Sequence, residues 1–169
     1  MSKSGAAEWA GAFASTLAVC AALGIAVFES VRARRTERAR RLETERDAVY
    51  GAFAVFSDLQ SQIRSITQWT ADGPWNPVAI ELAAANVDQV VRQFDRIDQA
   101  RFPNAAYLII TRGMYAQAIT TQHVVKTMVA MVNVGEPTDP EDPSRCEHRI
   151  GNILGHFRDQ ALKDGFRLD

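Results

Sequence analysis

Apolar residues follow two patterns along this chain, one continuous and one periodic. The continuous stretch covers 9–28, where no residue carries a charged side chain and the polar interruptions are Ser15, Thr16 and Cys20. At about 1.5 Å per residue, this stretch makes a helix about 30 Å long, which matches the hydrocarbon core of a bilayer. The pattern predicts a single N-terminal transmembrane helix over 9–28, preceded by a short extracytoplasmic N-terminus over 1–8.

From residue 49 onward, apolar residues recur at spacings of three and four, which places them on one face of each of four successive helices. The four apolar stripes are Val49, Ala52, Phe56, Leu59, Ile63 and Ile66; Ile80, Ala84, Val87, Val91, Phe94 and Ile97; Tyr107, Ile110, Met114, Ala118, Thr121, Val125, Met128 and Val132; and Cys146, Ile150, Ile153, Leu154, Phe157 and Ala161. No sustained alternation of period two occurs. The predicted fold class is therefore all-α, with an antiparallel four-helix bundle over 49–169.

Capping residues indicate where the second and third of these helices begin. Asn76 followed by Pro77 is a cap residue with proline at the first helical position, and this pair predicts the start of the second helix. We expect that helix to end near Phe102, just before a proline. Asn104 then predicts the start of the third helix.

The fourth helix is predicted to follow a surface loop. The segment 136–143 is acidic and has proline at 137, 140 and 143, which disfavours a helix there. Ser144 with Glu147 fits a capping box and predicts the helix start, while Gly165 predicts its end.

Charge is distributed unevenly, although the formal net charge is only −1. A basic juxtamembrane helix is predicted over 29–48, because arginines crowd the segment after the apolar stretch: Arg32, Arg34, Arg35, Arg38, Arg40 and Arg41. Lys3 is the basic side chain on the other side. The positive-inside rule then places the C-terminal domain in the cytoplasm and the N-terminus outside, with the chain in the inner (cytoplasmic) membrane.

The same arginines indicate a lipid partner, because each cation near an anionic leaflet contributes about 1 kcal/mol to membrane attraction. Nucleic acid is not favoured, since Glu37, Glu43 and Glu45 are interspersed and no aromatic residue occurs there before Tyr50.

Small residues recur along the predicted span. Rows four residues apart let helix backbones approach closely in lipid, and the rows here are Gly11 and Ser15, and Ala14, Ala18, Ala22 and Ala26. An alanine-rich composition alone would also produce such rows. We expect a protein partner or a homo-oligomer.

The sharpest candidate for catalysis is Arg149 followed at the seventh position by His156. This spacing resembles the signature of HEPN-type ribonucleases, which are also helical, and the resemblance implies metal-independent RNA cleavage with His156 as general acid or base. Ile150 departs from the pattern, because that family usually has a polar residue after the arginine. His148, Asn152 and His156 share a helix face, but no Glu-x-x-His pair accompanies them, so neither a metal site nor a cofactor is predicted.

These observations favour a membrane-anchored, non-catalytic interaction, scaffold or regulatory protein. The alternative is a membrane-bound HEPN-like ribonuclease or toxin-like effector. The layout resembles that of small bacterial proteins with one N-terminal span and an arginine-rich border. Cys20 is expected in the bilayer and Cys146 in the soluble domain, so no disulfide between them is expected, which agrees with a reducing compartment.

Overall fold

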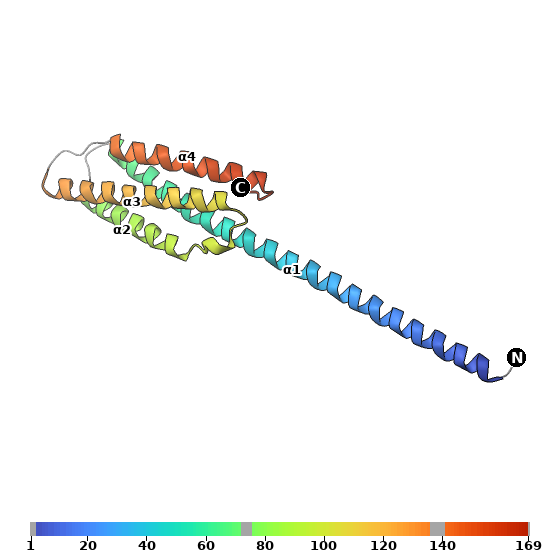
Figure 1. Ribbon diagram of the computed structural model, residues 1–169. Helices are drawn as coiled ribbons and strands as arrows, with labels where there is room; N and C mark the ends of the chain where they lie inside the picture. Colours follow the sequence, from blue (N-terminus) through green and yellow to red (C-terminus); the bar gives the residue numbers. More distant parts are fainter. Residues whose placement is uncertain (1–2, 72–75, 136–140, 169) are drawn as a thin grey trace. The chain divides into compact units, whose positions relative to one another are not determined.

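The computed structural model describes residues 3–71, 76–135 and 141–168, and within these ranges it contains helices and no strand. The all-α prediction is therefore confirmed. The elements are α1 (Lys3–Ala71), α2 (Pro77–Gln93), the short 3-10 helices η1 (Phe94–Arg96) and η2 (Gln99–Arg101), α3 (Ala105–Asn133) and α4 (Glu141–Lys163) (Figure 1).

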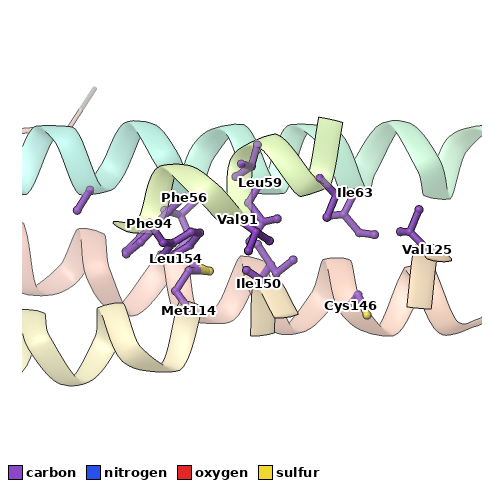
Figure 2. Close-up of a cluster of buried hydrophobic side chains, with 14 of the residues drawn as sticks. Phe56, Leu59, Ile63, Val91, Phe94, Met114, Val125, Cys146, Ile150 and Leu154 are labelled. Atoms are coloured by element: carbon purple, nitrogen blue, oxygen red, sulfur yellow. The ribbon is translucent and has the colours of Figure 1, made fainter. Parts of the chain in front are cut away.

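The chain divides into two compact units, Met1–Glu43 and Thr44–Asp169, and α1 contributes residues to both. The second unit, which we call the helical unit, contains the hydrophobic core. Every core position predicted for α1 is buried there, and so are those predicted for α4 apart from the half-buried Ile153. Figure 2 shows how side chains of α1 and α4, such as Leu59 and Ile150, point toward one another. Helical periodicity alone thus identified the inward faces of α1 and α4. In the other two predicted stripes, Ala84, Ile97, Ile110 and Val132 are half-buried and the remaining positions are buried.

Aromatic rings form one end of this core. Phe157 of α4 packs edge-on against Phe56 of α1, with ring centroids 5.0 Å apart, and against Tyr107 of α3 at 5.3 Å. Phe56 also stacks on Phe94 of η1 at 5.6 Å. Phe157 therefore joins three segments that lie far apart in the sequence, and such edge-to-face pairs stabilise beyond their buried area.

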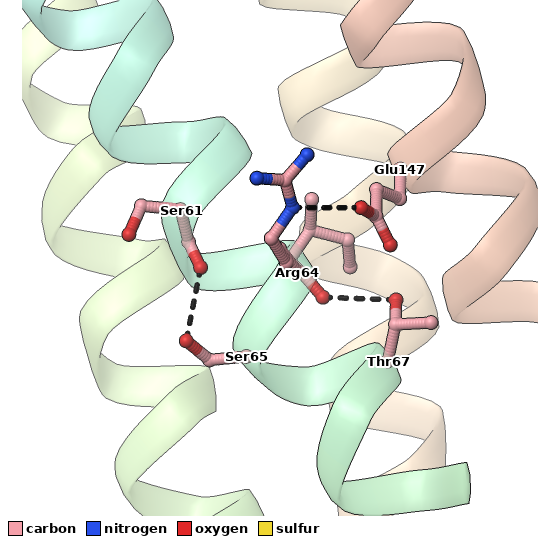
Figure 3. Close-up of polar contacts among 6 residues, drawn as sticks. Ser61, Arg64, Ser65, Thr67 and Glu147 are labelled. Carbon is pink, nitrogen blue, oxygen red and sulfur yellow. Dashed lines mark hydrogen bonds and ion pairs between the residues drawn. The ribbon is translucent and has the colours of Figure 1, made fainter.

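Polar side chains connect the helices around the core. Arg64 Nε of α1 donates a 3.1 Å hydrogen bond to Glu147 Oε1 of α4 (Figure 3). On α2, Asp88 accepts a 2.7 Å hydrogen bond from Gln122 Nε2 and lies 3.1 Å from Lys126 Nζ. Burial acts to raise the pKa of Asp88, but Gln122, Lys126 and the nearby Arg92 cation together outweigh it and lower the pKa below its usual value.

The predicted helix starts at Asn76 and Asn104 are confirmed. The Asn76 side chain accepts a hydrogen bond from the backbone N–H of Val78, and that of Asn104 accepts one from Ala106, both at 3.0 Å. Each bond satisfies one of the free N–H groups of a helix start. Asn104 Nδ2 also donates to Asp164 Oδ2 at 2.9 Å, which links the start of α3 to the end of α4.

Gly165 ends α4 as predicted. Its φ of +84° is a left-handed conformation that favours glycine, and its N–H bonds to the Leu162 carbonyl at 3.1 Å. The N–H of Phe166 bonds to the Ala161 carbonyl at 2.8 Å, which completes a Schellman motif. Phe166 is thereby turned toward Tyr107, with ring centroids 6.5 Å apart.

The predicted end of the second helix near Phe102 is wrong, because α2 ends at Gln93 and is followed by η1 and η2. Two local features explain the break. The Asp98 side chain accepts the N–H of Ala100 at 3.3 Å and so begins a new turn. Phe102 is extended, with φ −65° and ψ 141°, as expected for a residue before proline.

The predicted start of the fourth helix is also wrong. α4 begins at Glu141, so Ser144 lies inside it and no capping box forms there. Glu147 bonds to Arg64 instead. Pro143, predicted in a loop, is a buried residue of the first helical turn. Proline is tolerated at this position because the first N–H groups of a helix have no partner within it.

Candidate functional site

The apolar part of α1 is exposed. Within the described residues, α1 is the one helix long and apolar enough to cross a membrane, and none of its most apolar window is buried. Its large exposed side chains are Phe13, Leu17, Val19, Leu23, Ile25, Val27 and Phe28. At 3.6 residues per turn they cover about two thirds of the helix circumference. By its length and composition, this helix could span a membrane.

The predicted small-residue rows occupy the remaining face of the same helix. Ser15, Ala18, Ala22 and Ala26 are exposed, whereas the side chains of Gly11 and Ala14 lie outside the described residues. The large side chains are therefore absent from this face, although the small residues Ala21 and Gly24 lie among the large ones. Cys20 is exposed and lies two residues from Ala18, so the two point to nearly opposite sides.

The six clustered arginines predicted to contact lipid are all exposed on α1. Hydroxyl groups beside them bond to the helix backbone: Ser30 Oγ donates to the Val27 carbonyl at 2.8 Å, and Thr36 Oγ1 to the Arg32 carbonyl at 3.0 Å. These two hydroxyl groups therefore have acceptors within the helix.

Arg149 and His156 are both exposed on α4. In the described part of the chain, no hydrogen bond or ion pair joins them, and no group of three or more potential metal ligands occurs. His148 Nε2 instead lies 3.1 Å from Asn152 Nδ2, one turn away. The nuclease interpretation therefore stays a prediction without structural support.

Cys146 is buried in the helical unit, as its apolar stripe predicted. Burial raises the pKa of its thiol, although a hydrogen bond with Thr121 of α3 acts in the opposite direction. A buried thiol of raised pKa is a poor nucleophile at neutral pH. Gln117 and Thr111, which the sequence analysis did not assign to the core, are also buried on α3.

A second candidate site, which sequence reasoning missed, is a cavity of about 390 Å³ in the helical unit. We call it the α1–η cavity, because it lies between the part of α1 that follows Glu43 and the segment of η1 and η2. Its lining residues are Asp47, Ala48, Gly51, Ala52, Val55, Gln93, Arg96, Ile97, Asp98 and Arg101. The lining residues outside α1 lie at and after the end of α2 at Gln93, where the sequence had predicted a continuous helix.

Comparisons with protein-family models, with curated proteins and with solved structures found no match to this chain. Fold similarity therefore supplies no function for this chain. Two features stand out on that basis: the exposed apolar segment of α1 with its arginines, and the α1–η cavity.

Proposed function

We propose that this chain is a membrane-anchored, non-catalytic interaction protein that serves as a scaffold or regulator. The observation that carries the proposal is the exposed apolar surface of α1 followed directly by exposed arginines. Burying a large apolar side chain is worth about 1.5–3 kcal/mol, so leaving this whole segment in water costs on the order of 10 kcal/mol. Insertion of 9–28 into a bilayer removes that cost, and the arginines then lie at the lipid headgroups.

In this proposal the helical unit is an antiparallel four-helix bundle on the cytoplasmic side. Its pairings support this topology, because residues later in one helix contact residues earlier in the next. Between α1 and α4, Phe56 pairs with Phe157 and Arg64 with Glu147. Between α3 and α4, Tyr107 pairs with Phe157, and the more distal Thr121 with Cys146. In each pair of helices, the residue numbers of the contacts increase along one helix and decrease along the other, as in antiparallel packing.

Orientation is tested with maleimide labelling of intact cells. Cys146 is buried, so an exposed reporter is added by Ser144→Cys on the same helix, in a Cys146→Ser background. With arginines holding the C-terminal side in the cytoplasm, a membrane-impermeant maleimide should modify this reporter only after permeabilisation. Modification of native Cys146 should require unfolding of the protein in addition to permeabilisation, because this thiol is buried.

Labelling of the reporter in intact cells would contradict the proposed orientation. As a matched variant, glutamine at all six clustered arginines removes the positive charge but leaves the apolar segment unchanged. This variant should give a mixed population, part of which is labelled without permeabilisation.

The proposed partner is another transmembrane helix that packs on the small-residue face, either from a second copy or from another membrane protein. The chain offers a matched pair for the test. Ala18→Cys, made with Cys20→Ser, places a thiol on the small-residue face, whereas native Cys20 lies on nearly the opposite face. Oxidation of membranes should cross-link the Ala18→Cys variant several-fold more than the parent chain.

The mass of the product identifies the partner. A species of twice the monomer mass indicates a second copy, and an adduct of another mass indicates a different protein. If both thiol positions leave the chain monomeric under oxidation and in mild detergent, the interaction proposal fails.

A further inference from the structure

Charged and apolar residues both line the α1–η cavity. The apolar ones include Ala48, Ala52, Val55 and Ile97, and Ala52 is fully buried. Among the charged ones, Asp47 comes from α1 and Arg96 from η1. At about 390 Å³ its volume lies within the range of small-molecule sites, which combine an apolar lining with a few polar groups.

Two of the four charged residues in the cavity are already paired with local partners. Asp98 Oδ2 lies 2.7 Å from Arg101 Nε, and Asp98 Oδ1 accepts the backbone N–H of Ala100 at 3.3 Å. Both carboxylate oxygens of Asp98 therefore hold the η2 turn together. Asp98 and Arg101 thus belong to the cavity lining, but their opposite charges largely balance each other.

The other two charged residues are not paired. Across the described residues, Asp47 and Arg96 form no ion pair or hydrogen bond, with each other or with another side chain. The cavity lining thus includes one unpaired carboxylate, from α1, and one unpaired guanidinium, from η1. An anion would be attracted by Arg96 but repelled by Asp47. A cation would be attracted by Asp47 but repelled by Arg96.

Gly51 leaves additional room in the cavity lining. A Cβ built on Gly51 would have no atom within 4 Å apart from its own helix. Glycine inside a helix is destabilising by about 0.5–1 kcal/mol relative to alanine. A larger side chain introduced at Gly51 therefore begins in open space in the cavity lining.

We propose that the α1–η cavity binds a small zwitterion with an apolar side group, of the size of an amino acid or dipeptide. Asp47 accepts from the ligand's ammonium group, and Arg96 donates to its carboxylate. The apolar group lies on Val55 and Ile97. Charge-assisted hydrogen bonds of this kind are stronger than neutral ones, which favours a ligand that carries both charges. This inference does not depend on the membrane function proposed above.

The test titrates leucine into the full-length chain in mild detergent, with calorimetry or NMR shifts as the readout. Three analogues each remove one feature: N-acetyl-leucine lacks the ammonium group, leucinamide lacks the carboxylate, and glycine lacks the apolar group. Leucine should saturate a single site and bind about tenfold or more tightly than each analogue. A parallel titration with leucyl-leucine distinguishes a peptide site from a free amino-acid site.

Variants then assign each contact. Asp47→Asn should weaken leucine binding about tenfold but leave N-acetyl-leucine unchanged, because that analogue has no ammonium group to lose. Arg96→Gln should likewise weaken leucine binding about tenfold but leave leucinamide binding unchanged, because leucinamide has no carboxylate. Gly51→Leu should abolish binding of every probe by filling the space.

The matched controls are Asp58→Asn on α1 and Arg92→Gln on α2, which are exposed outside the cavity and should bind leucine like the parent. All variants should keep the parent's helical circular dichroism. All except Gly51→Leu should keep its unfolding midpoint to within a few degrees, and Gly51→Leu should raise the midpoint because glycine is a weak helix former. The proposal is overturned if neither leucine nor leucyl-leucine binds saturably, or if leucine binds the Gly51→Leu variant as it binds the parent.

Discussion

Replacing Val19 with arginine should release the protein from the membrane fraction. Val19 lies near the middle of 9–28 and is exposed on α1. An arginine at the centre of a span costs about 2.5–3.5 kcal/mol on the insertion scale, and the variant also loses about 0.3–0.6 kcal/mol from valine. The total is about 3–4 kcal/mol, which corresponds to several hundredfold in the insertion equilibrium. A span filled largely with alanine has little surplus with which to offset it.

Val78→Arg is the matched control for this experiment. Val78 is another exposed valine, with 72% of its surface accessible, but it lies on α2 of the helical unit. After lysis and alkaline washing, the parent and Val78→Arg should stay with the membranes, and Val19→Arg should appear in the supernatant. Retention of Val19→Arg after washing would contradict a span over 9–28. Release of both variants would show that any added arginine detaches the chain.

The long periodic segments could be predicted from the sequence because burial of one helix face leaves a regular spacing. The α1 stripe from Val49 to Ile66 lies wholly in the core for this reason. Helix ends were less predictable, because several neighbouring residues can each start or end a helix. At Ser144 a plausible cap is present, yet α4 starts earlier, with Glu141, Asp142 and Pro143 in its first turn. Acidic residues there suit the helix dipole.

Contacts between distant helices left no signal that one sequence could reveal. Arg64 and Glu147 are 83 positions apart, and nothing in either local pattern indicates the other. The α1–η cavity is of the same kind, because its lining combines residues of α1, such as Asp47, with residues that follow the end of α2, such as Arg96. The end of α2 could have been predicted from the short stretch between Gln93 and Pro103. There, Asp98 as a turn residue and the proline after Phe102 both disfavour a continuous helix.

Replacing Phe157 with alanine should destabilise the helical unit more than any exposed substitution. The ring is fully buried and packs against Phe56 and Tyr107, so its removal leaves a cavity shared by three helices. Phenylalanine-to-alanine changes in cores cost about 3–5 kcal/mol, and small domains are stable by only about 5–15 kcal/mol. The variant should therefore lose a large fraction of its unfolding free energy.

Urea unfolding followed by circular dichroism measures this loss, and Leu162→Ala is the control. Leu162 lies on the same helix but is 68% exposed, so its truncation should change the unfolding free energy by about 0.5 kcal/mol or less. A loss below about 1 kcal/mol for Phe157→Ala would contradict the aromatic packing. Phe157→Ala should remain in the membrane fraction, because residues 9–28 are unchanged. Val19→Arg should conversely keep the parent's unfolding midpoint, because the core of the helical unit does not include residue 19.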